Sequence, residues 1–135
     1  PDQRQAYEKI INSIRNETGG LYFIDAPGGT GKTFVLNLLL AQVRQESNII
    51  LAAASSGIAA TLLDGGRTAH SSLKLPLNIH QQEEPVCNIN RGTGRAYLLK
   101  RAKAIIWDEC TMAHKKSLEA LDRTLRFIRG NDVLM

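Results

Sequence analysis

The order of hydrophobic and polar residues along the chain predicts helices that alternate with strands. Three segments place apolar residues every three or four positions, the spacing that buries one face of a helix: 4–16, 32–44 and 118–128. Three short and continuous apolar runs are typical of buried strands: 21–25, 48–53 and 104–107. Shorter helices are expected after Gly57 and over 96–102.

This order predicts an α/β fold in which helices cover both faces of a parallel sheet. Ligands of such sheets bind at the carboxyl ends of the strands. Residues 71–92, which include Pro76 and Pro85, show no clear period and are expected to form a surface excursion. The Gly-Thr-Gly-Arg stretch at 92–95 follows no predicted strand, and we interpret it as a loop.

Length and composition indicate one globular domain with a core built mainly from aliphatic residues. The chain has 135 residues, of which 43% are hydrophobic, 22% charged and 5% aromatic. The formal net charge of +4 permits a polyanionic partner such as nucleic acid without demanding one. Cys87 and Cys110 lack metal-binding spacing and indicate a reducing, intracellular environment. No apolar run is long enough to span a membrane.

A glycine-rich stretch between the first predicted strand and the next helix carries the strongest chemical pattern. Its residues are Gly28, Gly29, Thr30, Gly31, Lys32 and Thr33, preceded by Pro27. In a P-loop, backbone N–H groups surround the phosphates of ATP, and the helix N-terminus adds its partial positive charge. Lys32 is expected to reach the β- and γ-phosphates and Thr33 to bind Mg²⁺. Ala26 stands where the full pattern has glycine, and the alternative is a glycine-rich turn without function.

Two carboxylates follow the last predicted strand. Asp108 and Glu109 come directly after an apolar run that ends at Trp107. Together with a P-loop, Asp108 is expected to hold Mg²⁺, and Glu109 to act as the general base that activates the attacking water. Without a P-loop, the same pair would be an ordinary polar loop. The pair favours ATP hydrolysis over a small-molecule kinase, because a kinase transfers phosphate to a substrate hydroxyl rather than to water.

Four blocks of the sequence carry a resemblance to a known family. They are Pro27 to Thr33, the ASSGIAA block at 54–60, the GGRTAHS block at 65–71 and the IIWDE block at 105–109. The chain resembles, nearly from end to end, the PIF-one-like (petite integration frequency) DNA helicases of superfamily one, especially the subgroup linked to Helitron transposons. The resemblance implies a RecA-like P-loop NTPase domain of an ATP-dependent DNA helicase that moves 5′ to 3′ on single-stranded DNA. It also implies work in DNA repair, recombination and telomere maintenance, in the nucleus or the mitochondrion.

The resemblance also assigns roles to individual residues. It implies that Gln3 contacts the adenine and that the segment from Pro27 to Thr33 binds the rest of the nucleotide. Three residues are implied to contact the DNA backbone: Ser56, Thr68 and His70. Short hydroxyl side chains are suitable for such phosphate contacts. On local chemistry alone, capping of the following helix by Ser55 and Ser56 is an equally good interpretation.

Members of this family continue into a Gly-Asp and Gln segment that senses the γ-phosphate, and then into a second motor domain. Residues 1–135 are therefore expected to be a first motor domain truncated before both, with weak or no unwinding of its own. A gap is expected in the sheet between the P-loop strand and the acidic strand, unless residues 132–135 begin to fill it. Two alternatives stay open: a truncated transposon-derived remnant that binds nucleotide without turnover, and a DNA-independent P-loop ATPase.

Overall fold

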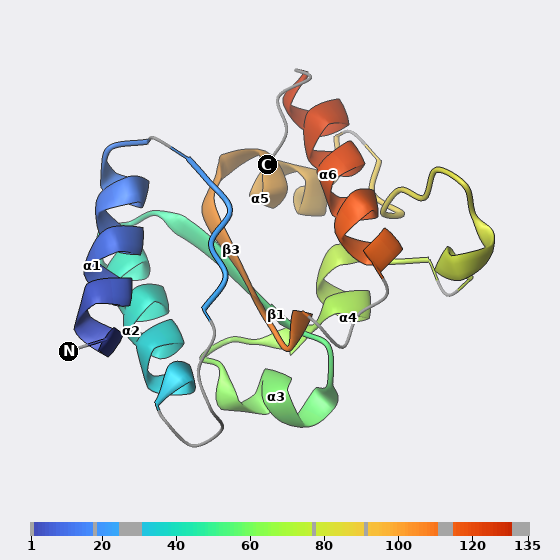
Figure 1. Ribbon diagram of the computed structural model, residues 1–135. Coiled ribbons are helices and arrows are strands. Elements are labelled where there is room, and N and C mark those ends of the chain that lie inside the picture. Colours follow the sequence, from blue (N-terminus) through green and yellow to red (C-terminus); the bar gives the residue numbers. More distant parts are fainter. Residues whose placement is uncertain are drawn as a thin grey trace.

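The computed structural model describes residues 2–17, 19–24, 31–76, 78–90, 92–110 and 115–130, with the side chains of Asp2, Gln3 and His80 excepted. In this part of the chain, a parallel sheet of strand order β2-β1-β3 runs between two groups of helices (Figure 1). The strands are β1 (Ile49–Ala54), β2 (Arg67–Thr68) and β3 (Ala102–Asp108). The predicted α/β fold with a parallel sheet covered on both faces is confirmed.

Alternate side chains of β1 and β3 enter two separate cores. In β1, Ala52 and Ala54 belong to one buried cluster, whereas Ala53 belongs to the other. In β3, Ile106 belongs to the first cluster and Trp107 packs against the second. Successive residues of a strand point to opposite faces, so a strand covered on both faces has to be apolar throughout. This requirement explains why both strands appear in the sequence as continuous apolar runs.

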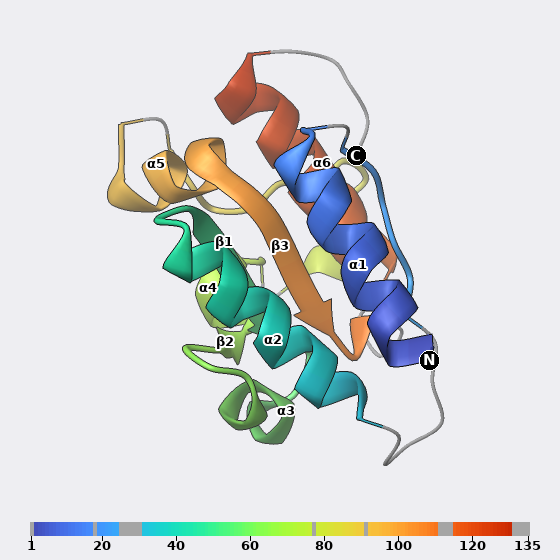
Figure 2. The ribbon, with the colours of Figure 1, turned by 90° about the vertical axis from the view of Figure 1, so that its left-hand side faces the viewer.

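Two long helices and one short helix cover the first core. They are α1 (Asp2–Arg15), α2 (Lys32–Gln45) and α3 (Gly57–Leu62), and Figure 2 shows α1 and α2 in front of the sheet. The buried face of α2 has the helical spacing of one stripe: Leu36, Leu39, Leu40 and Val43. Burying each such side chain stabilises the fold by roughly 1.5–3 kcal/mol. None of the described helices is long and apolar enough to cross a membrane.

The second core lies under three further helices and one short turn. These are α4 (Ala69–Leu73), the 3-10 turn η1 (Ile79–Gln81), α5 (Gly94–Arg101) and α6 (Lys115–Arg129). Gly92 and Thr93 form a turn before α5, as the loop interpretation predicts, whereas Gly94 and Arg95 already belong to the helix. Thr93 caps this helix, because its hydroxyl accepts a hydrogen bond from the Ala96 N–H at 3.2 Å.

The described part of residues 71–92 has many exposed side chains, as expected of a surface excursion, but it is also anchored in the second core. Five of their apolar side chains are buried there: Leu73, Leu75, Ile79, Cys87 and Ile89. Helix α6 holds the backbone of this segment, because Arg123 donates to the Pro85 carbonyl and the Thr124 hydroxyl accepts from the Cys87 N–H at 2.8 Å. The prediction missed this burial because it depends on contacts with α6, which the local spacing of apolar residues does not report.

The strand predicted over 21–25 is absent from residues 21–24, and Asp25 lies outside the described residues. The segment turns back beside α1 (Figure 1), and the side chains of Leu21 and Phe23 are 53% and 66% exposed. A strand needs a neighbour that satisfies its N–H and C=O groups. Within the described residues, no strand lies on the other side of β3, so this segment has no neighbouring strand with which to form a ladder.

The turn between α3 and β2 requires glycine at position 66. A Cβ atom at Gly66 would lie 2.5 Å from the carbonyl oxygen of Ala60, closer than Cβ atoms approach other heavy atoms. The Gly66 N–H donates to the Leu63 carbonyl at 2.9 Å and closes the turn. The turn that contains the two glycines of the GGRTAHS block therefore brings β2 back beside β1. Thr68 then lies opposite Ala54, at the carboxyl end of β1.

Candidate active site

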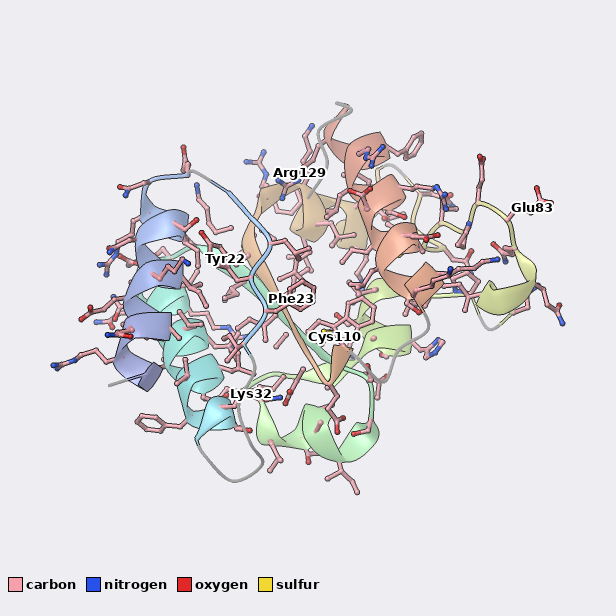
Figure 3. The ribbon with its side chains drawn as sticks, in the orientation of Figure 1. Tyr22, Phe23, Lys32, Glu83, Cys110 and Arg129 are labelled. Atoms are coloured by element: carbon pink, nitrogen blue, oxygen red, sulfur yellow. The ribbon has the colours of Figure 1, made fainter. Side chains whose placement is uncertain are left out.

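The predicted chemical residues gather at the carboxyl edge of the sheet. Strands β1 and β3 are paired so that Ala54 lies opposite Asp108. The residues that follow, Ser55 and Ser56 in one case and Glu109 in the other, therefore leave the sheet side by side. Figure 3 shows Lys32, at the start of α2, near this end of β3.

The start of α2 has the geometry of an anion-binding helix terminus. Gly31 adopts a left-handed conformation with φ of 89° and has no side chain that could cap the helix. The first N–H groups of this 14-residue helix have no partner within the helix, and its dipole places partial positive charge at this end. Lys32 and Thr33 are half-buried in its first turn. Pro27, Gly28, Gly29 and Thr30 lie outside the described residues, so the phosphate loop itself stays a prediction.

An ion pair joins the two predicted motifs. Lys32 Nζ lies 3.0 Å from Asp108 Oδ1, and the side chains are 33% and 6% exposed. A carboxylate buried to this extent without a partner costs several kcal/mol, which the neighbouring ammonium group offsets. The same Asp108 oxygen accepts a hydrogen bond from the Glu109 N–H at 2.9 Å. The Asp108 carboxylate is thus oriented toward positive charge from two directions.

This donor set fits Mg²⁺ shared with a phosphate. Mg²⁺ binds to proteins through one or two oxygen side chains, phosphate oxygens and water. The buried Asp108 carboxylate already faces a cation, and the Thr33 hydroxyl lies in the first turn of α2. No group of three or more His, Cys, Asp or Glu side chains gathers anywhere in the described ranges, so nothing there indicates a metal held by the protein alone.

Glu109 leaves the end of β3 in a strained backbone conformation. Its φ of 57° is left-handed, which costs about 1–2 kcal/mol for a residue with a Cβ atom. Its carboxylate lies toward α3, where Ser56 Oγ donates a hydrogen bond to Glu109 Oε1 at 2.6 Å. Strain of this kind concentrates at functional sites, where the surrounding structure holds it in place.

Ser55 and Ser56 connect the end of β1 to the end of β3. The Ser55 N–H donates to the Asp108 carbonyl at 3.1 Å, and the Ser55 hydroxyl accepts from Trp107 Nε1 at 3.0 Å. Ser56 Oγ also accepts from the Ala59 N–H at 3.2 Å, so it caps α3 as the local interpretation predicts. Sequence reasoning missed the link to the acidic pair. No motif reveals this link, because it depends on the pairing of the two parallel strands, which makes the residues after their paired ends neighbours.

The remaining predicted residues lie apart from the acidic pair. Thr68 caps α4 by accepting from the Ser71 N–H at 3.2 Å, and His70 is exposed on that helix. No hydrogen bond between described residues links either of them to Asp108 or Glu109. Gln3 belongs to α1, but its side chain lies outside what the structure describes.

Comparison with known proteins identifies the relatives of this arrangement. A family model described as PIF1-like helicase matches residues 1–133. The chain is 31% identical over 116 residues to the ATP-dependent DNA helicase Pif1 of Psychrobacter sp. (strain PRwf-1), which covers 86% of this chain and 18% of that protein. Bacteroides Pif1 bound to ssDNA matches with a TM-score of 0.69 at 26% identity, over 94% of this chain and 29% of that chain. Bacteroides sp Pif1 in complex with ADP-AlF4 matches with a TM-score of 0.67 at 27% identity, over 95% and 28%.

These matches establish the fold as RecA-like, in agreement with the prediction. The chain spans about a fifth of the length of the curated relative and less than a third of the solved chains. The part matched by the family model, residues 1–133, nevertheless includes every block on which the resemblance was based. Because the family model covers nearly the whole chain, the chain belongs to the PIF1-like helicase family.

Proposed function

We propose that residues 1–135 form the first RecA-like motor domain of an ATP-dependent DNA helicase, which couples hydrolysis of ATP to movement on single-stranded DNA. The observation that carries the proposal is the contact between Lys32 and Asp108. It brings the end of the phosphate-loop motif within 3.0 Å of the end of the acidic strand. The solved relatives support it, because Bacteroides Pif1 has been observed with ADP-AlF4 and with ssDNA.

ATP binding exchanges the Lys32–Asp108 contact for contacts with the ligand. Lys32 turns to the β- and γ-phosphate oxygens, and the backbone of residues 28–33 surrounds the phosphates. Asp108 and the Thr33 hydroxyl would hold Mg²⁺, which would neutralise phosphate charge. Gln3 contacts the adenine in this proposal, as the resemblance implies.

Glu109 supplies the general base. Its carboxylate orients the attacking water and accepts a proton from it as the bond to the γ-phosphate breaks. The position after Asp108 suits this role, because the residue that holds the metal and the residue that holds the water are then adjacent. The strained backbone of Glu109 supports the assignment.

Ser56, Thr68 and His70 are the proposed contacts to the DNA backbone. Ser56 follows β1 and Thr68 ends β2, so both hydroxyls lie along the carboxyl edge of the sheet. Contacts to phosphate position a strand without reading its sequence, which suits a motor that moves along DNA. The net charge of +4 also suits a polyanionic partner.

The finer assignments rest on the resemblance. They are membership of the Helitron-linked subgroup, 5′ to 3′ movement, a second motor domain as partner, roles in repair, recombination and telomere maintenance, and residence in the nucleus or mitochondrion. Among the described residues, the unpaired edge of β3 and the exposed side chains of Leu21 and Phe23 support a further strand between them.

The test is ATP hydrolysis by the full gene product that carries these residues, with and without single-stranded DNA. We expect DNA to stimulate turnover, Lys32→Ala to abolish it, and Lys100→Ala, at an exposed lysine of α5, to leave it unchanged. Hydrolysis that ignores DNA would favour the DNA-independent ATPase. Nucleotide binding without hydrolysis would favour the transposon-derived remnant.

A further inference from the structure

We propose that Ser56 is a positioning residue for Glu109: its hydroxyl holds the Glu109 carboxylate in the orientation in which that carboxylate acts on water. The contact joins two segments that are 53 positions apart, and it places the ASSGIAA block in direct contact with the acidic strand. This inference rests on the proposed role of Glu109 as general base. It competes with the assignment of Ser56 to DNA contact, because the single hydroxyl proton cannot be donated to Glu109 and to a phosphate oxygen at the same time.

The Ser56 hydroxyl uses its donor and an acceptor site for two different purposes. A serine hydroxyl has one proton and two lone pairs. It accepts from the Ala59 N–H at 3.2 Å, which leaves its proton for Glu109 Oε1 at 2.6 Å. That shorter distance is typical of a hydroxyl that donates to an ionised carboxylate. The cap therefore fixes the position of the oxygen atom, and the oxygen atom fixes the carboxylate.

The carboxylate of Glu109 depends on this contact for its orientation. Among the described residues, Ser56 provides the one hydrogen bond that the Glu109 side chain makes. The main chain is fixed separately, because the Glu109 N–H donates to Asp108 Oδ1 and its φ is 57°. Removal of the Ser56 hydroxyl leaves the backbone in place and frees the side-chain torsions. A base that must lie within hydrogen-bond reach of a water is sensitive to this loss of orientation.

Substitutions at position 56 can separate capping from positioning. Ser56→Ala removes both, and Ser56→Thr keeps a hydroxyl for both. Ser56→Asp caps a helix as well as serine does, but it places a second carboxylate against Glu109 and cannot donate to it when ionised. Thr93→Ala is the matched control, because Thr93 caps α5 with the same 3.2 Å bond and has no contact with the acidic pair.

The experiment measures kcat and KM for ATP in the full gene product at saturating single-stranded DNA. We expect Ser56→Ala to lower kcat about tenfold, the size of effect found for residues that orient catalytic groups, and to change KM for ATP less than about twofold. Ser56→Thr restores kcat, and Ser56→Asp lowers it at least as far as alanine does. Thr93→Ala leaves it unchanged. A kcat near that of the wild type for Ser56→Asp overturns the proposal, because capping alone would then suffice.

A double substitution separates failure of this inference from failure of the proposed function. Ser56→Ala added to Glu109→Gln should cause no further loss of single-turnover rate, because Ser56 acts through Glu109. An additional tenfold loss contradicts positioning. If Glu109→Gln alone hydrolyses ATP at the wild-type rate, the general base is misassigned and both proposals fail. If Glu109→Gln is impaired and Ser56→Ala is normal, positioning alone fails.

Discussion

The two ends of β3 use charged side chains in opposite ways. At the amino end, the Arg129 guanidinium donates to the carbonyl oxygens of Leu99 and Ala102, each at 3.1 Å. At the carboxyl end, the Lys32 ammonium group faces the Asp108 carboxylate. Figure 3 shows Arg129 and Lys32 near opposite ends of the strand. One cation is bonded to the main chain, and the other to an ionised side chain.

The difference separates a structural contact from an exchangeable one. Arg129 satisfies carbonyl groups at the end of α5, which have no partner within the helix. No ligand can take its place without exposing those carbonyls. The Lys32–Asp108 pair can be replaced on both sides, because a phosphate suits the ammonium group and a metal ion suits the carboxylate. The carboxyl end of β3 is therefore the end suited to binding a ligand. Four measurements test this difference between the two ends.

The largest expected effect is on turnover. Glu109→Gln should reduce ATP hydrolysis by the full gene product about 10²–10⁴-fold, the usual contribution of a general base. ATP affinity should change little, because Lys32 and Asp108 are untouched. Steady-state turnover and equilibrium binding of ATP measure the two quantities. Glu119→Gln, at an exposed site on α6, is the control, and equal losses in both variants would contradict the assignment.

A smaller effect is expected on stability at the amino end. Arg129→Ala should lower the free energy of unfolding of this chain by about 1–2 kcal/mol, because two carbonyl groups lose their partner. Urea unfolding measures this difference. Arg4→Ala, whose side chain is 84% exposed, should change the free energy of unfolding by no more than about 0.5 kcal/mol. A loss of ATP affinity in Arg129→Ala would break the distinction between the two ends.

Asp108→Asn tests the carboxyl end in the absence of nucleotide. The free energy of unfolding should change by less than about 1 kcal/mol, since Lys32 is one-third exposed and can reach water. The Mg²⁺-dependent part of ATP affinity should fall in the same variant. Unfolding and binding measured side by side check this contrast. A loss of several kcal/mol in stability would mean that the pair is structural after all.

The smallest effect involves Glu17, whose pKa is lowered by its hydrogen bond and charge interaction with Lys103. A lowered folded-state pKa means that the stabilisation is present above the ordinary carboxyl value of 4.5 and is lost as pH falls through the folded-state pKa. Both groups are exposed, so the contribution is small and is screened by salt. The difference in Tm between wild type and Glu17→Gln should vanish as pH is lowered below 4.5. A difference that grows on acidification contradicts this assignment.

The sequence was sufficient where local pattern and tertiary environment agree. Strands β1 and β3 are buried on both faces, and α2 buries one stripe, so each follows the hydrophobic period that predicts it. The strand predicted over 21–25 was wrong for residues 21–24, because an apolar run carries no information about whether a neighbouring strand is present to pair with it. The burial of apolar residues within 71–92 was not predicted, because it depends on side chains of α6, which is far away in the sequence.

The candidate site also has a part that the sequence predicts and a part that it does not. Lys32, Asp108 and Glu109 could be identified from motifs, because each motif lies where a predicted strand meets the next segment. The Ser56–Glu109 contact could not, because it arises from the register between β1 and β3. Motifs identify chemical groups, whereas the contacts between groups from different motifs depend on tertiary structure.

The end of β1 is built from the smallest side chains that still form a buried core. Ala52 and Ala54, 4% and 0% exposed, share a cluster with the apolar stripe of α2. Helix α2 therefore lies close to the sheet beside the site, and the small volume of these alanine side chains helps Lys32 to reach Asp108. Ala52→Val adds two methyl groups to this layer, and they act as a spacer that moves α2 outward. Position 52 thus offers a way to adjust the distance between the two motifs while every reacting group stays the same.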